Sequence, residues 1–193
     1  MNKRIPMAAI AVALAAVSTS SFAADQGAFF INGNLGQSNY HDSGFTDHTD
    51  TSTSVRAGYS WQGSTTDFGV EAGYVSLGTA SGSVSTNNVT ANYSVKGTGP
   101  LLGVNFKYKF NNKMFLSARG GWFHSSLDAN ISGLGSQNFH GDGSYIGAGV
   151  GYDISSHFSL GVSYDDYHAR AKIYGIKSGE SIGVFSGFAE YRF

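Results

Sequence analysis

The sequence contains no cysteine, so disulfide bonds contribute nothing to its stability. Proline is almost absent, since the 193 residues include only two, and Pro100 is the one that lies beyond residue 23. Because proline removes a backbone N–H donor, its scarcity favours a chain whose amides are nearly all paired. Charged residues make up 13% of the chain, against about 25% in an ordinary soluble domain. These absences exclude a disulfide-stapled domain and argue against an ordinary water-soluble one.

Glycine and aromatic residues are abundant instead. The chain has 27 glycines, and phenylalanine, tyrosine and tryptophan together account for 14% of it. Disordered chains can also be rich in glycine, but they lack this aromatic content. A closed sheet that crosses a membrane fits the whole composition, because there every backbone N–H must find its partner within the sheet.

The first 23 residues have the pattern of a secretory signal peptide. Lys3 and Arg4 form a positive start, and an apolar stretch follows that ends in small residues at Ala23. The apolar stretch is too short for a transmembrane helix, which needs roughly 20 apolar residues. We therefore expect cleavage before Ala24.

The remaining chain, residues 24–193, is expected to form one domain. It has ten basic and thirteen acidic residues, which give a formal charge of −3. A nucleic-acid-binding domain would show a basic patch, so we expect no nucleic-acid partner.

Eight segments of the chain alternate between apolar and polar residues. Successive residues of a strand point to opposite faces, so this alternation predicts strands with one apolar face. The clearest case is 102–110, where Leu102, Val104 and Phe106 stand opposite Gly103, Asn105 and Lys107. The eight segments are 29–36, 55–61, 68–77, 102–110, 114–124, 146–152, 158–165 and 181–193.

Charged residues stand in the middle of several segments, on the face opposite the aromatic residues; Glu71, Lys107, Arg119, Glu190 and Arg192 are examples. A soluble β-sandwich would turn such a face to water, whereas a membrane barrel would enclose it as a polar lumen. The two alternatives differ in their connectors, because membrane barrels have short periplasmic turns and longer external loops.

The connectors alternate between short and long. Three are short, at 62–65, 111–113 and 155–157, and four are long, at 39–54, 78–93, 125–142 and 169–180. Seven connectors of this kind are what eight antiparallel strands need. The sequence therefore predicts an all-β fold: an eight-stranded antiparallel transmembrane β-barrel with short periplasmic turns and four long extracellular loops. Side chains nearly fill so narrow a barrel, so little solute flux is expected.

Several motifs resemble the transmembrane domain of the OmpA family, and the resemblance covers nearly all of residues 24–193. Segment 39–45 is similar to the end of the family's first strand and the start of its first loop, and 68–74 resembles its third strand. Segments 149–152 and 191–193 also fit. The resemblance implies an integral protein of the bacterial outer membrane. Full-length OmpA proteins add a periplasmic peptidoglycan-binding domain that is not found here, so no wall-anchoring role is expected.

The family's barrel encloses a cluster of acidic and basic side chains that plugs the lumen and has been linked to gating. Glu71 matches one acidic position and Arg119 an inward-facing arginine, whereas Asn105, Gly151 and Gly161 stand at the other acidic positions. The cluster is therefore largely missing in its family form, and a gate of that form is not expected.

Four residues are nevertheless the candidate lumen charge cluster: Arg56, Glu71, Lys107 and Arg119. We expect Glu71 to pair with one of the three basic residues, because an unpaired buried charge is costly. The sequence leaves open whether the cluster only packs the lumen or lets ions cross.

A second candidate site is formed by His124 and Ser126, which are two residues apart and share the face predicted to meet lipid. Small barrel lipid A deacylases use a histidine and a serine in this arrangement. A catalytic triad requires a third group, which the sequence does not place. Polar residues where a strand runs into a loop are the simpler interpretation, and the dipeptide Asp165-Asp166 is likewise interpreted as a strand end at the headgroup layer.

The first long loop carries His41, Asp42 and His48, which we regard as possible ligand contacts. Such side chains can bind a divalent cation, but they lack the tight spacing of a metal site, so a solvated acidic loop is favoured. We expect no metal and no cofactor.

The OmpA resemblance implies a structural or surface-interaction protein that is not an enzyme, with roles in envelope integrity and in adhesion or ligand contact through the loops. A narrow porin or a channel for small hydrophobic molecules is the first alternative, and a lipid A-modifying enzyme is the second. The expected partners are outer-membrane lipid and lipopolysaccharide, the barrel-assembly machinery through the C-terminal strand that ends at Phe193, and host or phage ligands at the loops. We expect a monomer.

Overall fold

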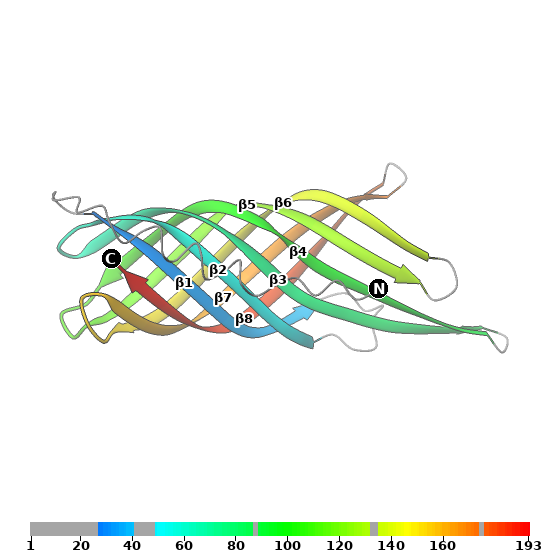
Figure 1. Ribbon diagram of the computed structural model, residues 1–193, viewed down its shortest axis with the longest axis horizontal. Coiled ribbons are helices and arrows are strands. Elements are labelled where there is room, and N and C mark those ends of the chain that lie inside the picture. The colour runs from blue at the N-terminus through cyan, green and yellow to red at the C-terminus, as the bar shows by residue number, and fades with distance from the viewer. Residues whose placement is uncertain (1–26, 41–48, 87–88, 132–134, 174–175) are drawn as a thin grey trace.

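The computed structural model describes residues 27–40, 49–86, 89–131, 135–173 and 176–193. The predicted signal peptide, 1–23, and the loop residues His41, Asp42 and His48 lie outside these ranges. Eight antiparallel strands close into one barrel in which each strand pairs with its neighbour in sequence (Figure 1). The predicted fold class is confirmed. No helix in the described ranges is long and apolar enough to cross a membrane.

The strands are β1 (Gly27–Tyr40), β2 (Thr49–Gln62), β3 (Thr66–Thr86), β4 (Val89–Lys109), β5 (Met114–Ile131), β6 (Gly135–Asp153), β7 (Phe158–Ile173) and β8 (Ile176–Arg192). They are 14 to 21 residues long. A strand needs only about 9–11 residues to cross a bilayer, so the sheet continues beyond the membrane.

The seam between the first and last strands closes the barrel. β1 and β8 pair from Phe30↔Arg192 to Tyr40↔Ile182. The Phe193 amide then donates a hydrogen bond of 2.9 Å to the Phe29 carbonyl oxygen. The predicted C-terminal strand, 181–193, is therefore the strand that closes the barrel, and closure leaves the barrel wall without an open edge.

The three short connectors are tight turns at the end of the barrel where the chain terminates (Figure 1). The backbone N–H of Gly63, Phe110 and Ile154 donates across its turn to Thr66, Met114 and Phe158 respectively. Lys113 has a φ of 66°, in the left-handed region that a tight turn requires. The predicted short connectors are confirmed.

The predicted boundaries of the four long loops are wrong, because much of each segment is paired strand. β3 and β4 pair as far as Thr86↔Val89, and β5 and β6 pair as far as Ile131↔Gly135. The Ser-, Thr- and Gly-rich composition indicated loops. Strand propensity depends on context, however, and a paired neighbour satisfies the backbone of such residues in a ladder.

A four-stranded sheet extends beyond the barrel wall on the side opposite the tight turns (Figure 1). Pairing between β2 and β3 ends at Thr53↔Ser76, and pairing between β6 and β7 ends at Ser144↔His168. Past these points β3, β4, β5 and β6 remain paired with one another. A register shift next to Ser76, where Gly78 has a φ of 79°, marks the start of this extension on β3.

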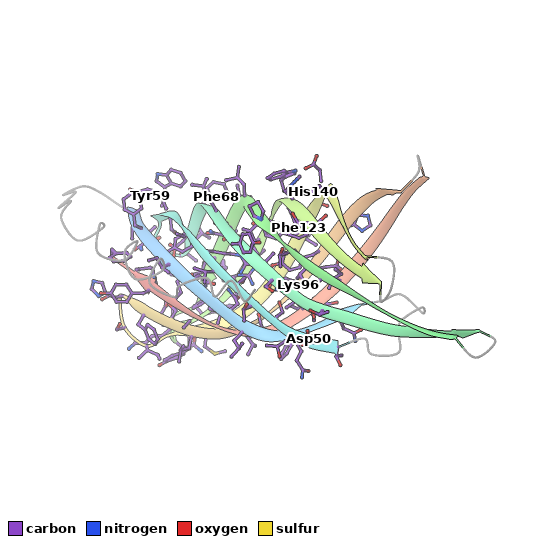
Figure 2. The ribbon with its side chains drawn as sticks, turned by 45° about the vertical axis from the view of Figure 1, so that its right-hand side comes forward. Asp50, Tyr59, Phe68, Lys96, Phe123 and His140 are labelled. Carbon is purple, nitrogen blue, oxygen red and sulfur yellow. The ribbon has the colours of Figure 1, made fainter. Side chains whose placement is uncertain are left out.

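The two faces of the barrel wall differ as the alternation predicts. Leu102, Ile146 and Phe185 are among the exposed outer residues, and Ile146 is 70% exposed. Inward residues such as Arg56 and Asp165 are only 1% and 2% exposed. Figure 2 shows the contrast for Phe68, at the outline of the barrel, and Phe123, within it. An apolar outside around a charged inside is the reverse of a soluble sandwich.

Candidate functional site

Arg56 of β2 and Glu71 of β3 are diagonal neighbours on the inner face of the barrel. Arg56 Nε lies 3.6 Å from Glu71 Oε1, and both side chains are almost fully buried. Glu71 also accepts hydrogen bonds from Tyr145 Oη at 2.7 Å and Asn105 Nδ2 at 3.0 Å. Arg56 Nη2 donates to Tyr167 Oη at 2.7 Å. The expected pairing of Glu71 with a neighbouring base is confirmed, with Arg56 as the partner.

Arg119 forms an ion pair with Asp165, a residue that the sequence pattern assigned to the headgroup layer. Its Nε and Nη2 donate to the two oxygens of Asp165 at 2.6 and 2.5 Å, a bidentate fork. The interpretation of Asp165 as a headgroup-layer residue is therefore wrong, because Asp165 is buried in the lumen. Gly147 provides the space, since a Cβ there would lie 2.0 Å from Asp165 Oδ1.

A second set of pairs lies nearer the tight turns. Lys107 Nζ is 2.9 Å from Glu190 Oε1, and Lys109 Nζ is 2.8 Å from Asp67 Oδ1. Arg192 pairs with Asp153 and also donates to Ser159. The members of these five pairs are Arg56–Glu71, Arg119–Asp165, Lys107–Glu190, Lys109–Asp67 and Arg192–Asp153. Five positive and five negative groups thus neutralise one another inside the barrel.

The four predicted lumen residues therefore all lie inside the barrel, but they do not form one cluster. Arg56 and Glu71 contact each other, whereas Lys107 and Arg119 have their own carboxylate partners. A cavity of about 40 Å³ lies between the two sets, lined by Glu71 and Lys107 among others. It has room for only a few water molecules.

An apolar plug lies between the charge pairs and the long hairpins, and sequence reasoning missed it. Its members are Val75, Leu77, Leu101, Phe123, Tyr145, Tyr167, Ile182 and Val184. The rings of Tyr145 and Tyr167 stack with their centroids 5.8 Å apart. The Tyr145 hydroxyl contacts Glu71 and the Tyr167 hydroxyl contacts Arg56, so the plug touches the charge pairs directly. The alternation along each strand did indicate these residues, because every plug residue stands at an alternate position on the same inward face as the polar residues of its strand.

The outer face carries a polar cluster near the rim of β5 and β6. His124 Nδ1 lies 2.8 Å from Asp142 Oδ1, and the imidazole stacks on Trp122 with centroids 5.6 Å apart. The His140 ring follows at 6.0 Å. Ser126 lies opposite His140 in the ladder.

Asp142 is the acid that the sequence could not place beside His124. Within the described ranges no hydrogen bond joins Ser126 to His124. A triad requires the base within hydrogen-bond reach of the hydroxyl. Among the residues that the structure describes, no group of three or more His, Cys, Asp or Glu could hold a metal ion. The predicted loop contacts at His41, Asp42 and His48 lie outside those residues.

The fold is shared with small barrels of known structure. Neisserial surface protein A is 10% identical, with a TM-score of 0.55 over 86% of this chain and 97% of that one. Ail, the attachment invasion locus protein of Yersinia pestis, is 13% identical, with a TM-score of 0.52 over 88% and 100%. OprG of Pseudomonas aeruginosa is 13% identical, with a TM-score of 0.50 over 88% and 97%.

Among curated protein sequences, none matches the chain. The family model for the outer membrane protein beta-barrel domain matches residues 9–193, which is nearly the whole sequence. The apolar outer surface, the neutralised charged lumen and this match agree with one another. The chain therefore belongs to the outer membrane protein beta-barrel domain family, and it is an integral protein of the bacterial outer membrane.

Proposed function

We propose that this chain is a non-enzymatic surface protein whose closed barrel anchors extracellular hairpins for contact with ligands or other cells. The observation that carries the proposal is the sealed lumen. Five charge pairs fill its middle and the end near the turns, and the apolar plug covers them on the hairpin side. A pathway for ions would have to cross both layers.

The extension of β3, β4, β5 and β6 supports the contact role. It carries strand backbone well past the barrel wall, at the end away from the turns. The strand edges of such a sheet are able to pair with an extended partner chain. Surface roles are also indicated by the names of two relatives, Neisserial surface protein A and the attachment invasion locus protein. The second was also solved in complex with the heparin analogue sucrose octasulfate.

The sealed lumen predicts that the purified barrel gives no steady open-channel current in a planar lipid bilayer. The physical reason is that an ion would have to displace tightly paired charges and then enter the apolar plug. A steady current that changed in Glu71→Ala or Arg119→Ala would contradict the proposal and favour a narrow pore.

The contact role predicts that cells displaying the native chain bind at least one of a panel of host-cell and matrix-coated surfaces more strongly than cells displaying a chain without residues 80–95. A shortening of the β7–β8 hairpin by residues 171–178 is the matched control, because that hairpin is not part of the extended sheet. Surface display of each chain is quantified by antibody before adhesion is counted. Equal adhesion by all three displayed chains would remove the support for sheet-mediated contact.

A further inference from the structure

The β3–β4 hairpin leaves the barrel wall at an irregularity of the β3 backbone. On the β2 side, ladder pairing of β3 ends at Thr53↔Ser76. On the β4 side, the register shifts between Ser76 and Thr79, where two residues of β3 stand against one of β4. Gly78, inside this shift, has a φ of 79°, a conformation that glycine adopts without strain. A β-bulge of this kind bends its strand and re-aims the residues that follow it.

Two serine side chains hold β3 on the barrel side of Gly78. Ser52 of β2 donates a hydrogen bond from its hydroxyl group to the Ser76 carbonyl oxygen at 3.0 Å. Ser38 of β1, which is fully buried, donates to the Leu77 carbonyl oxygen at 2.6 Å. The Leu77 side chain belongs to the apolar plug. β3 is therefore attached to the wall as far as Leu77, although its ladder with β2 ends before that residue.

A carboxylate holds β3 on the hairpin side of Gly78. Asp50 of β2 accepts a hydrogen bond at Oδ2 from the backbone N–H of Thr79, at 2.6 Å. Its other oxygen, Oδ1, accepts from the backbone N–H of Thr51 at 2.7 Å, which fixes the orientation of the carboxylate. Hydrogen bonds to an ionised acceptor are roughly twice as strong as neutral ones. Figure 2 shows Asp50 near the end of β2, where the β3–β4 hairpin leaves the wall.

Gly78 lies between these attachments and is in close contact with Asp50. A Cβ at Gly78 would lie 2.7 Å from Asp50 Cβ, so the carboxylate reaches Thr79 only because residue 78 has no side chain. In the ladder of the described strands, β3 pairs with β4 alone beyond this point. Two attachments before Gly78 and one after it make Gly78 a pivot, and they leave Asp50 to set the direction of the hairpin.

We propose that Asp50 is a clasp, a positioning residue that fixes the direction in which the β3–β4 hairpin leaves the barrel wall. While the clasp is closed, the hairpin continues the wall as one rigid sheet. When it opens, the hairpin rotates about Gly78, and Ser38 and Ser52 keep β3 attached to the wall. The inference rests on the proposed contact role for its biological meaning, because the direction of the hairpin determines which partner surface it meets. The clasp itself can be tested without any ligand.

The test is amide hydrogen exchange of the purified full-length barrel in lipid nanodiscs, followed by NMR. Asp50→Ala removes the acceptor of the Thr79 amide, which should then exchange about tenfold faster, a factor typical of losing a hydrogen bond to a charged group. The Val75 amide, in the part of β3 that is paired with both neighbours, should exchange as in the native chain. Spin labels at Val55→Cys on the wall and Ser83→Cys on the hairpin should give a broader distance distribution in Asp50→Ala.

Three further variants separate the clasp from a general effect of charge. Asp50→Asn keeps one carbonyl oxygen and can retain only one of the two accepted hydrogen bonds, so Thr79 should exchange faster than in the native chain. Asp142→Asn is the matched control, because it removes the same charge from β6 of the extended sheet, where the carboxylate contacts His124. It should leave Thr79 exchange unchanged. Gly78→Ala places a methyl group against Asp50 and should accelerate Thr79 exchange as Asp50→Ala does.

Unchanged Thr79 exchange in Asp50→Ala, or equal acceleration in Asp142→Asn, would overturn the clasp. On a surface that the native chain binds through residues 80–95, Asp50→Ala should also reduce adhesion. Undiminished adhesion together with faster exchange would overturn the positioning role of Asp50. Equal adhesion by the native and the hairpin-shortened chains would instead refute the contact role, and the exchange measurement would still decide whether Asp50 holds the hairpin.

Discussion

Replacing Glu71 with alanine is expected to lower the free energy of unfolding by about 3–5 kcal/mol, the range for removing one partner of a buried ion pair. Arg56 is only 1% exposed, and the substitution leaves its guanidinium group without a carboxylate. Tyr145 and Asn105 lose their shared acceptor in the same step. The measurement is urea unfolding of the barrel refolded in lipid vesicles, followed by tryptophan fluorescence.

The double variant Arg56→Met with Glu71→Met is the matched control for this prediction. It removes both charges and keeps apolar volume in the lumen, so it should lose much less stability than Glu71→Ala. If Glu71→Ala unfolded at the same urea concentration as the native barrel, the Arg56–Glu71 pair would not be a buried ion pair in the membrane-bound protein.

Replacing Gly36 with valine is expected to prevent the barrel from closing. Gly36 lies on the inward face of β1 at the seam, and a Cβ there would lie 2.0 Å from the Phe185 carbonyl oxygen. That oxygen belongs to the backbone, so it cannot move aside without disrupting the pairing of β1 with β8. A folded barrel migrates differently from the unfolded chain on an unheated gel. Most of the Gly36→Val protein should therefore migrate as the unfolded chain does, with or without heating.

Gly33→Val provides the control on the same strand. Gly33 faces outward, and a Cβ there meets no atom within 4 Å. This variant should fold and show the same heat-dependent mobility shift as the native barrel. Equal folding of both variants would mean that the seam is wider than the β1–β8 register implies.

Sequence patterns predicted the eight strands well because strict alternation, as in β4, is typical of a strand with one apolar face and of few different structures. The same parity places Asp165 and Tyr167 inside, yet polarity led us to assign Asp165 to the headgroup layer. The error has a physical cause. Opposite charges on strands distant in sequence, such as Arg119 and Asp165, neutralise each other only once the closed barrel brings them together.

The predicted boundaries of the long loops were wrong for a different reason. Segment 79–86 has the composition of a loop, but its backbone pairs with 89–96 once the hairpin forms. The sequence also could not predict the His124–Asp142 contact, because that contact depends on the register between β5 and β6. Register is set by pairing across strands, which composition and spacing along one strand do not specify.

In the membrane, hydrocarbon meets the apolar face of the barrel, and the charged residues are enclosed. Because the chain has no cysteine, single-cysteine variants can be spin-labelled without background. Labels at Val104 and Leu160 on the outer face, and at Ser163 on the inner face, allow accessibility to oxygen and to a water-soluble nickel chelate to be compared in lipid bilayers. We expect high oxygen accessibility at Val104 and Leu160 and low accessibility to both reagents at Ser163. Ready access of the nickel chelate to Val104 and Leu160, with Ser163 exposed to the same reagent, would contradict this arrangement.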